Sequence, residues 1–96
     1  MMRRSVSSDA YEIEFRWKEE VIYWEGSRGV AFQGGWGAYP PVTIIPDSTT
    51  WDRKVPAWLH GRHDEVVARL RGDHRHVVHE ERDDSKNVHP LAEVTR

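Results

Sequence analysis

The clearest pattern in the chain is an alternation of apolar and charged positions that begins at Tyr11. The odd positions from Tyr11 to Trp17 are aromatic or branched, whereas the even positions from Glu12 to Lys18 are all charged. A period of two with aromatic and β-branched residues on one side is typical of a half-buried β-strand. Two further apolar runs, 21–25 and 30–33, follow at short intervals. This part of the chain therefore predicts three consecutive antiparallel strands.

The turns between these strands decide which side chains share a face. Glu25-Gly26-Ser27-Arg28 is typical of a tight hairpin, because glycine accepts the positive φ of such turns, and it would pair Tyr23 with Val30. For the first turn we predict a three-residue loop, residues 18–20, which would place Phe15 opposite Tyr23 and gather the apolar side chains on one side. Ile22 and Trp24 would be left on the outer face. The predicted core face carries Tyr11, Ile13, Phe15, Trp17, Val21, Tyr23, Val30 and Phe32.

The middle of the chain changes character at Gly34-Gly35-Trp36-Gly37. These glycines and the following Tyr39-Pro40-Pro41 exclude regular structure, because glycine relaxes the backbone and a diproline holds it extended. Val42 to Ile45 predicts a short fourth strand, which Pro46 ends.

The next segment predicts helical structure. Asp47 or Ser48 can cap a short helical turn, and Pro56 suits a first helical position. We place the main helix at about residues 61–71, because acidic residues open it, basic residues close it and Gly72 follows. Its inward side, with the preceding turns, carries Trp51, Val55, Trp58, Leu59, Val66 and Leu70.

Residues 74–81 predict one last short strand, so the element order is ββββαβ. We therefore expect an α+β fold: a four- to five-stranded twisted antiparallel sheet with one main helix packed on one face. A chain of 96 residues has the length of one domain. We place that domain at residues 10–81, between a flexible polar N-terminal tail, residues 1–9, and a flexible charged C-terminal tail, residues 82–96.

Composition narrows the functional classes. The formal charge of −2 gives no general attraction to nucleic acid or to an anionic membrane, so we expect neither as a direct partner. The chain has no cysteine, which excludes disulfides and thiolate chemistry. No apolar segment follows Arg3 and Arg4, so we expect no signal peptide and a cytoplasmic location.

The sequence contains little evidence for a catalytic or metal-binding site. His74 and His76 would project to the same side of a strand and could form a metal-binding pair, but a metal site needs three or four ligands. A solvated edge strand explains them as well. Glu12 and Glu14 are paired carboxylates, yet nothing places them in a cleft, and no nucleophile motif occurs. We therefore expect no catalytic residues, no resident metal and no cofactor.

Exposed aromatic residues point instead to binding. Ile22 and Trp24 on the outer face, with Trp36 and Tyr39 in the glycine–proline loop, are candidate contacts, because tryptophan and tyrosine are enriched at binding hot spots. Capping of the core is the competing interpretation for Trp36 and Tyr39. The charged residues beside them complete the candidate set: Glu12, Glu14 and Arg16.

The same layout resembles a known family. An opening Tyr-Glu-Ile strand, a second strand ending in Glu25-Gly26, Pro40-Pro41 before a short strand, then 48–52 (STTWD), a helix and a final strand resemble small immunity proteins of bacterial polymorphic toxin systems. The resemblance covers about residues 11–81. It implies a non-enzymatic protein that binds and neutralises a cognate protein toxin, and it transfers no defined site residue.

Two other functions stay open. The chain could be a stand-alone interaction module without a toxin, which its neighbouring genes would reveal. It could also be a small histidine–metal protein using His74 and His76, which a zinc or nickel titration would test. The sequence leaves the oligomeric state open.

Overall fold

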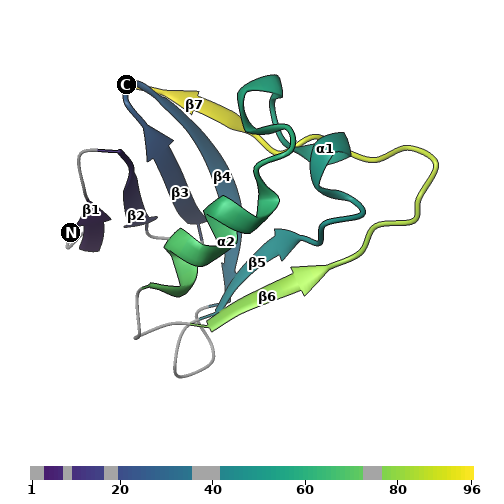
Figure 1. The fold of residues 1–96 in the computed structure, drawn as a ribbon, viewed down its shortest axis with the longest axis horizontal. Helices are drawn as coiled ribbons and strands as arrows, with labels where there is room; N and C mark the ends of the chain where they lie inside the picture. Colours follow the sequence, from purple (N-terminus) through teal and green to yellow (C-terminus); the bar gives the residue numbers. More distant parts are fainter. Residues whose placement is uncertain (1–3, 8–9, 17–19, 36–41, 73–76) are drawn as a thin grey trace.

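The computed structural model describes residues 4–7, 10–16, 20–35, 42–72 and 77–96, and it shows an α+β fold with one main helix (Figure 1). Within the described residues the sheet has seven strands, six of them in the order β1-β2-β3-β4-β5-β6, while β7 pairs with β4. The helix α2 lies across one face of this sheet. The strands are β1 Arg4–Ser7, β2 Glu12–Arg16, β3 Glu20–Glu25, β4 Arg28–Gly35, β5 Val42–Pro46, β6 Val77–Glu81 and β7 Glu93–Thr95; the helices are α1 Trp51–Lys54, the 3₁₀ turn η1 Ala57–Leu59 and α2 His63–Arg71.

The pairing of β2 with β3 differs from the predicted register by two residues. Phe15 pairs with Val21 rather than with Tyr23, and Arg16 pairs with Glu20, so the connecting loop is residues 17–19 instead of 18–20. A shift of two residues leaves every side chain on the same face, because the side-chain period of a strand is two. The predicted division into a core face and an outer face therefore survives the register error. Trp17 lies outside the described residues.

The hairpin between β3 and β4 is the one predicted. Glu25 pairs with Arg28 and Tyr23 pairs with Val30, and Gly26 adopts a φ of 64°. An L-residue with a side chain rarely adopts this left-handed backbone, which explains the glycine. The strand β4 extends beyond the predicted end at Gln33, and each half of its far edge has a different neighbour: residues 28–30 pair with β7 and residues 33–35 with β5.

The core lies between the predicted face of the sheet and the helical segment. Trp51 on α1 is 1 % exposed, and its indole Nε1 donates to the carbonyl of Leu59 at 2.8 Å, so burial leaves its polar atom satisfied. Trp58, predicted inward, is only partly buried. The helix α2 begins at His63, two residues later than predicted. The buried cluster contains Ile13, Phe15, Val21, Tyr23, Val30, Phe32, Ile45, Trp51, Val55, Leu59, Val66, Val67, Leu70 and Val78.

The last strand of the sheet path corrects the antiparallel prediction. β6 runs parallel to β5, with Val42 opposite Val77 and Pro46 opposite Glu81, so the sheet is mixed. Parallel neighbours need a long crossover connection, and the segment that carries α1, η1 and α2 supplies it. A helix between two adjacent strands was the signal for this parallel pair.

Both chain ends contain strands in segments that we expected as tails. β1 pairs with β2, and β7 pairs with β4. The C-terminal segment, residues 82–96, crosses the molecule from β6 to β4 (Figure 1) and is attached along its way. Asp83 N donates to the Thr50 hydroxyl at 3.0 Å, Leu91 N to the Lys54 carbonyl at 2.9 Å, and Arg96 N to the Ser27 carbonyl at 3.1 Å.

Candidate functional site

The outer face of β3 is closed to solvent. Ile22 is 0 % exposed and Trp24 is 1 % exposed, although both project away from the core beneath α2, as the register predicted. This corrects the prediction that Ile22 and Trp24 are exposed contacts for a partner. Their burial removes them from any contact surface in this conformation.

Charged side chains surround Trp24 on that face. Its Nε1 donates to the Glu14 carboxylate at 2.9 Å, and Glu14 itself is only 5 % exposed. The guanidinium of Arg96 lies 4.3 Å from the centre of a Trp24 ring, and that of Arg16 lies 5.9 Å from it. Cations over an indole face are held by the ring quadrupole. Trp24 thus anchors the end of the chain to the sheet.

The remaining predicted residues of that surface are also engaged or undescribed. Glu12 accepts a hydrogen bond from Arg96 at 2.8 Å, and Arg16 forms an ion pair with Glu14 at 3.2 Å. The structure therefore brings Glu12, Glu14, Arg16 and Trp24 together, but through internal contacts. The other candidates lie outside the described residues: Trp36, Tyr39, His74 and His76.

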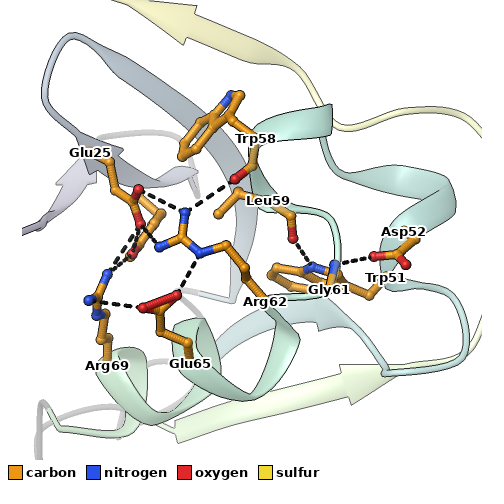
Figure 2. Close-up of polar contacts among 10 residues, drawn as sticks. Glu25, Trp51, Asp52, Trp58, Leu59, Gly61, Arg62, Glu65 and Arg69 are labelled. Carbon is orange, nitrogen blue, oxygen red and sulfur yellow. Dashed lines mark hydrogen bonds and ion pairs between the residues drawn. The ribbon is translucent and has the colours of Figure 1, made fainter.

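A second polar cluster joins α2 to the β3–β4 hairpin, and Figure 2 shows it in close-up. Glu25 receives both terminal nitrogens of Arg62, at 2.9 and 2.6 Å, in a bidentate pair. It also accepts from the Tyr23 hydroxyl at 2.6 Å and from Arg69 at 3.2 Å. Glu65 closes the arrangement by accepting from Arg62 at 2.6 Å and pairing with Arg69 at 3.2 Å. We call Tyr23, Glu25, Arg62, Glu65 and Arg69 the Glu25 cluster.

These contacts shift the pKa values within the Glu25 cluster in one consistent sense. Partial burial raises the pKa of Glu25, but hydrogen bonds from Arg62 and Tyr23 outweigh it and leave that pKa below the ordinary 4.5. Burial and the hydrogen bond to Glu25 raise the pKa of Tyr23 well above 10. The hydrogen bond to Glu25 raises the pKa of Arg62. These hydrogen bonds and ion pairs link α2 and its preceding residue Arg62 to the β3–β4 hairpin through Glu25.

The sequence contains part of the signal for the Glu25 cluster, but it does not reveal the cluster's acceptor. Arg62, Glu65 and Arg69 follow at spacings of three and four, which places them on one helical face that runs from the N-cap of α2 to its last turn. Glu25, which accepts from Arg62 and Arg69, lies 37 residues before Arg62 in the chain. Helical periodicity cannot identify a partner on a distant hairpin.

His63 connects α2 to β6. Its ring nitrogens lie 2.8 Å from Asp64 and 2.6 Å from Glu80, and Arg71 also pairs with Glu80 at 3.2 Å. The ring meets Trp51 edge-on, with 5.3 Å between centroids. In the part of the chain that the structure describes, no three histidine, aspartate or glutamate side chains are grouped to hold a metal ion.

The outer face of β5 and β6 is more exposed to solvent than the outer face of β3. Among the large hydrophobic side chains of the described residues, Val77 stands out as exposed, at 48 %. It lies opposite Val42, which is itself only partly buried, and Ile44 further along β5 is partly buried too. Exposure alternates along β6, with Val78 turned into the core. We call Val42, Ile44 and Val77 the β5–β6 face.

A small groove lies at the carboxyl ends of β5 and β6. It has a volume of about 180 Å³ and is lined in part by Ile44, Ile45, Pro46 and Leu91, with Gln33 and Glu81 among its polar residues. The carboxyl ends of parallel strands are common places for ligand sites in α/β sheets. At this volume the groove is below the roughly 300 Å³ of ordinary small-molecule sites.

Comparisons of the chain with protein-family models, curated protein sequences and solved structures found no match. None of the described helices is long and apolar enough to cross a membrane.

Proposed function

We propose that this chain is a non-enzymatic binding protein that neutralises a cognate bacterial toxin, as its resemblance to immunity proteins implies. It acts in the cytoplasm, in contact with neither nucleic acid nor membrane. Its mode of action is occupation of the toxin's surface by a small rigid domain. The described residues support this through one feature above all, the open edge of the sheet at β6.

The edge at β6 has the properties of a strand-addition site. β6 ends the strand order, so within the described residues it has a strand neighbour on one side only, β5. An edge strand presents unpaired backbone donors and acceptors, and adding a strand satisfies them while side-chain pockets supply specificity. The exposed Val77 offers apolar contact beside that edge, where native proteins ordinarily place charge.

The charges near this edge favour a basic partner. Glu81 is 60 % exposed and Asp64 is fully exposed, whereas the exposed Arg71 and Arg82 are paired with Glu80 and Asp84. Many toxins that attack nucleic acid have basic active sites, and complementary charge accelerates encounter and excludes wrong partners. This moves the proposed contact surface from the first three strands to β6 and its surroundings.

Binding to the product of the neighbouring toxin gene tests the proposal. The purified chain is expected to hold that product in a pull-down and to suppress its toxicity when both are expressed. Val77→Lys adds a charged side chain at the edge and removes the apolar contact, so we expect at least tenfold weaker binding, which is about 1.4 kcal/mol. Ser27→Lys adds the same charge at the exposed turn between β3 and β4 and serves as the matched control.

Two results would count against this function. Absence of any complex between the wild-type chain and the neighbouring product would remove the toxin partner. Equal binding by the two lysine variants, with wild-type stability in both, would remove the β6 edge as the contact.

A further inference from the structure

The groove at the carboxyl ends of β5 and β6 has a floor of aliphatic side chains. Ile44, Ile45 and Pro46 come from the end of β5, and Leu91 comes from the C-terminal segment. The volume of about 180 Å³ exceeds the ~150 Å³ of a cavity that admits benzene. It is therefore large enough for one long side chain.

The charged residues around the groove are largely neutralised in pairs. Lys54 lies 3.4 Å from Asp83, and hydrogen bonds from Ser85, with the nearby Lys54, lower the pKa of Asp83 to about 2, so this pair stays ionised. Arg82 pairs with Asp84 at 2.7 Å. Among the described residues, the side chain that comes within ion-pair distance of Glu81 is the His79 ring, at 3.9 Å, and no arginine or lysine is paired with it. One carboxylate thus remains available above an apolar floor.

We propose that this groove receives an arginine or lysine side chain from the partner that adds to β6. The proposal rests on the function proposed above and names the chemistry of its anchoring contact. Arginine and lysine have an aliphatic stem and a cationic head, and the stem can lie along apolar surface while the head meets an acidic group. The floor of the groove matches the stem, and the Glu81 carboxylate matches the head.

The position of the groove fits that partner. Glu81 is the last residue of β6, so a strand paired with β6 passes directly beside the groove. A side chain projecting from such a strand can enter it without a change in the sheet. The side-chain amide of the exposed Gln33, which also lines the groove, offers a further acceptor for the cationic head.

The test uses the full chain with isotope-labelled methyl groups and follows it by NMR. The probe is Nα-acetyl-arginine methylamide, with the lysine analogue alongside, and the control is Nα-acetyl-citrulline methylamide, which keeps the shape of arginine but lacks its charge. We expect saturable shifts of the Ile44, Ile45 and Leu91 methyls with the cationic probes. Compared with the arginine probe on the wild-type chain, the citrulline probe should bind the wild-type chain at least fivefold more weakly. The arginine probe should bind the Glu81→Gln variant at least fivefold more weakly as well. Asp64→Asn removes a fully exposed carboxylate that does not line the groove, and it should leave arginine binding unchanged.

The outcomes separate this inference from the proposed function. Equal shifts with arginine and citrulline, undiminished binding by Glu81→Gln, or no saturable shift at all would overturn the basic anchor. If that happens while Val77→Lys still weakens toxin capture, strand addition at β6 stands without the anchor. If the arginine probe binds as expected but the chain captures no toxin, the proposed toxin function fails and the groove's preference for a cation remains.

Discussion

The replacement Glu25→Gln tests whether the Glu25 cluster holds α2 against the sheet. Glu25 accepts four hydrogen bonds, two from Arg62 and one each from Tyr23 and Arg69. Glutamine has nearly the same shape but a single acceptor oxygen, and its amide group would face donors. Three of these bonds reach Oε2 and one reaches Oε1, so the variant loses at least the bond at the oxygen that becomes NH2, together with all of the charge attraction.

The size of the effect follows from burial. A hydrogen bond to a charged group contributes about 1.5–3 kcal/mol, whereas an exposed ion pair contributes only ~0–1 kcal/mol. The side chains of Glu25, Arg69 and Arg62 are 18, 22 and 31 % exposed, between these limits. We expect Glu25→Gln to lower the free energy of unfolding at pH 7 by about 2 kcal/mol, which for a domain of this size lowers Tm by roughly 8–16 °C.

The pH dependence gives the sharper test. The folded-state pKa of Glu25 lies below its ordinary value of 4.5, so the unfolded chain binds the proton more readily than the folded chain does. The stability contributed by the ionised carboxylate is therefore complete above pH 4.5 and is lost as the pH falls through the folded pKa. The difference in unfolding free energy between wild type and Glu25→Gln should be constant from pH 7 to about 5.5 and should shrink below 4.5.

Urea unfolding followed by circular dichroism, at steps of half a pH unit, measures that difference. Glu65→Gln is the matched control, because Glu65 binds the same two arginines but is 42 % exposed. We expect it to cost only about 0.2–1 kcal/mol. A loss below ~0.5 kcal/mol for Glu25→Gln, or one that persists unchanged at pH 3, would refute the role assigned to the cluster.

Two further substitutions test packing inside the sheet. The buried hydroxyl of Thr43 has no hydrogen-bond partner among the described residues. Thr43→Val should therefore raise the free energy of unfolding, measured by urea denaturation, by about 1 kcal/mol. A lower free energy of unfolding would show that the hydroxyl is hydrogen-bonded. A Cβ at Gly29 would lie 2.7 Å from Trp24 Cε3 and 2.9 Å from Val94 Cγ2, so Gly29→Ala should cost about 1–3 kcal/mol and loosen β7, measured as faster amide exchange at Val94. Unchanged stability and exchange would mean that the C-terminal segment does not press on Trp24.

The fold class could be predicted because period-two patterning and hairpin chemistry are local. Alternation from Tyr11 to Phe15 determined which side chains face the core, and Gly26 determined the second hairpin. The first register could not be determined, because loops at residues 17–19 and 18–20 give the same faces and differ only in pairings that the pattern does not distinguish. The helix between β5 and β6 is a signal that these two strands pair in parallel. The prediction instead applied the antiparallel pairing of the first strands to the whole sheet.

The end of the chain was beyond local patterning. Glu93–Thr95 is a short strand in a polar context, and its pairing with Arg28–Val30 spans more than 60 residues of sequence. A pairing over such a distance produces no hydrophobic periodicity in the sequence around either strand. The cover of Trp24 depends on this pairing, which is why Trp24 could not be predicted as buried.

The same contacts decide where an acidic partner-binding surface can lie. The sequence places several glutamates on the first hairpins, and counted as formal charges they make that edge acidic. In the structure Glu12 pairs with Arg96, Glu14 with Arg16, and Glu25 with Arg62 and Arg69, so these carboxylates are each compensated within the chain. A compensated carboxylate attracts a basic partner weakly, because binding must first break an existing ion pair. Among the described residues, the side chain at ion-pair distance from Glu81, at the end of β6, is the His79 ring at 3.9 Å, and no arginine or lysine is paired with it. Under the proposed function, we therefore expect electrostatic recognition of a basic partner at Glu81.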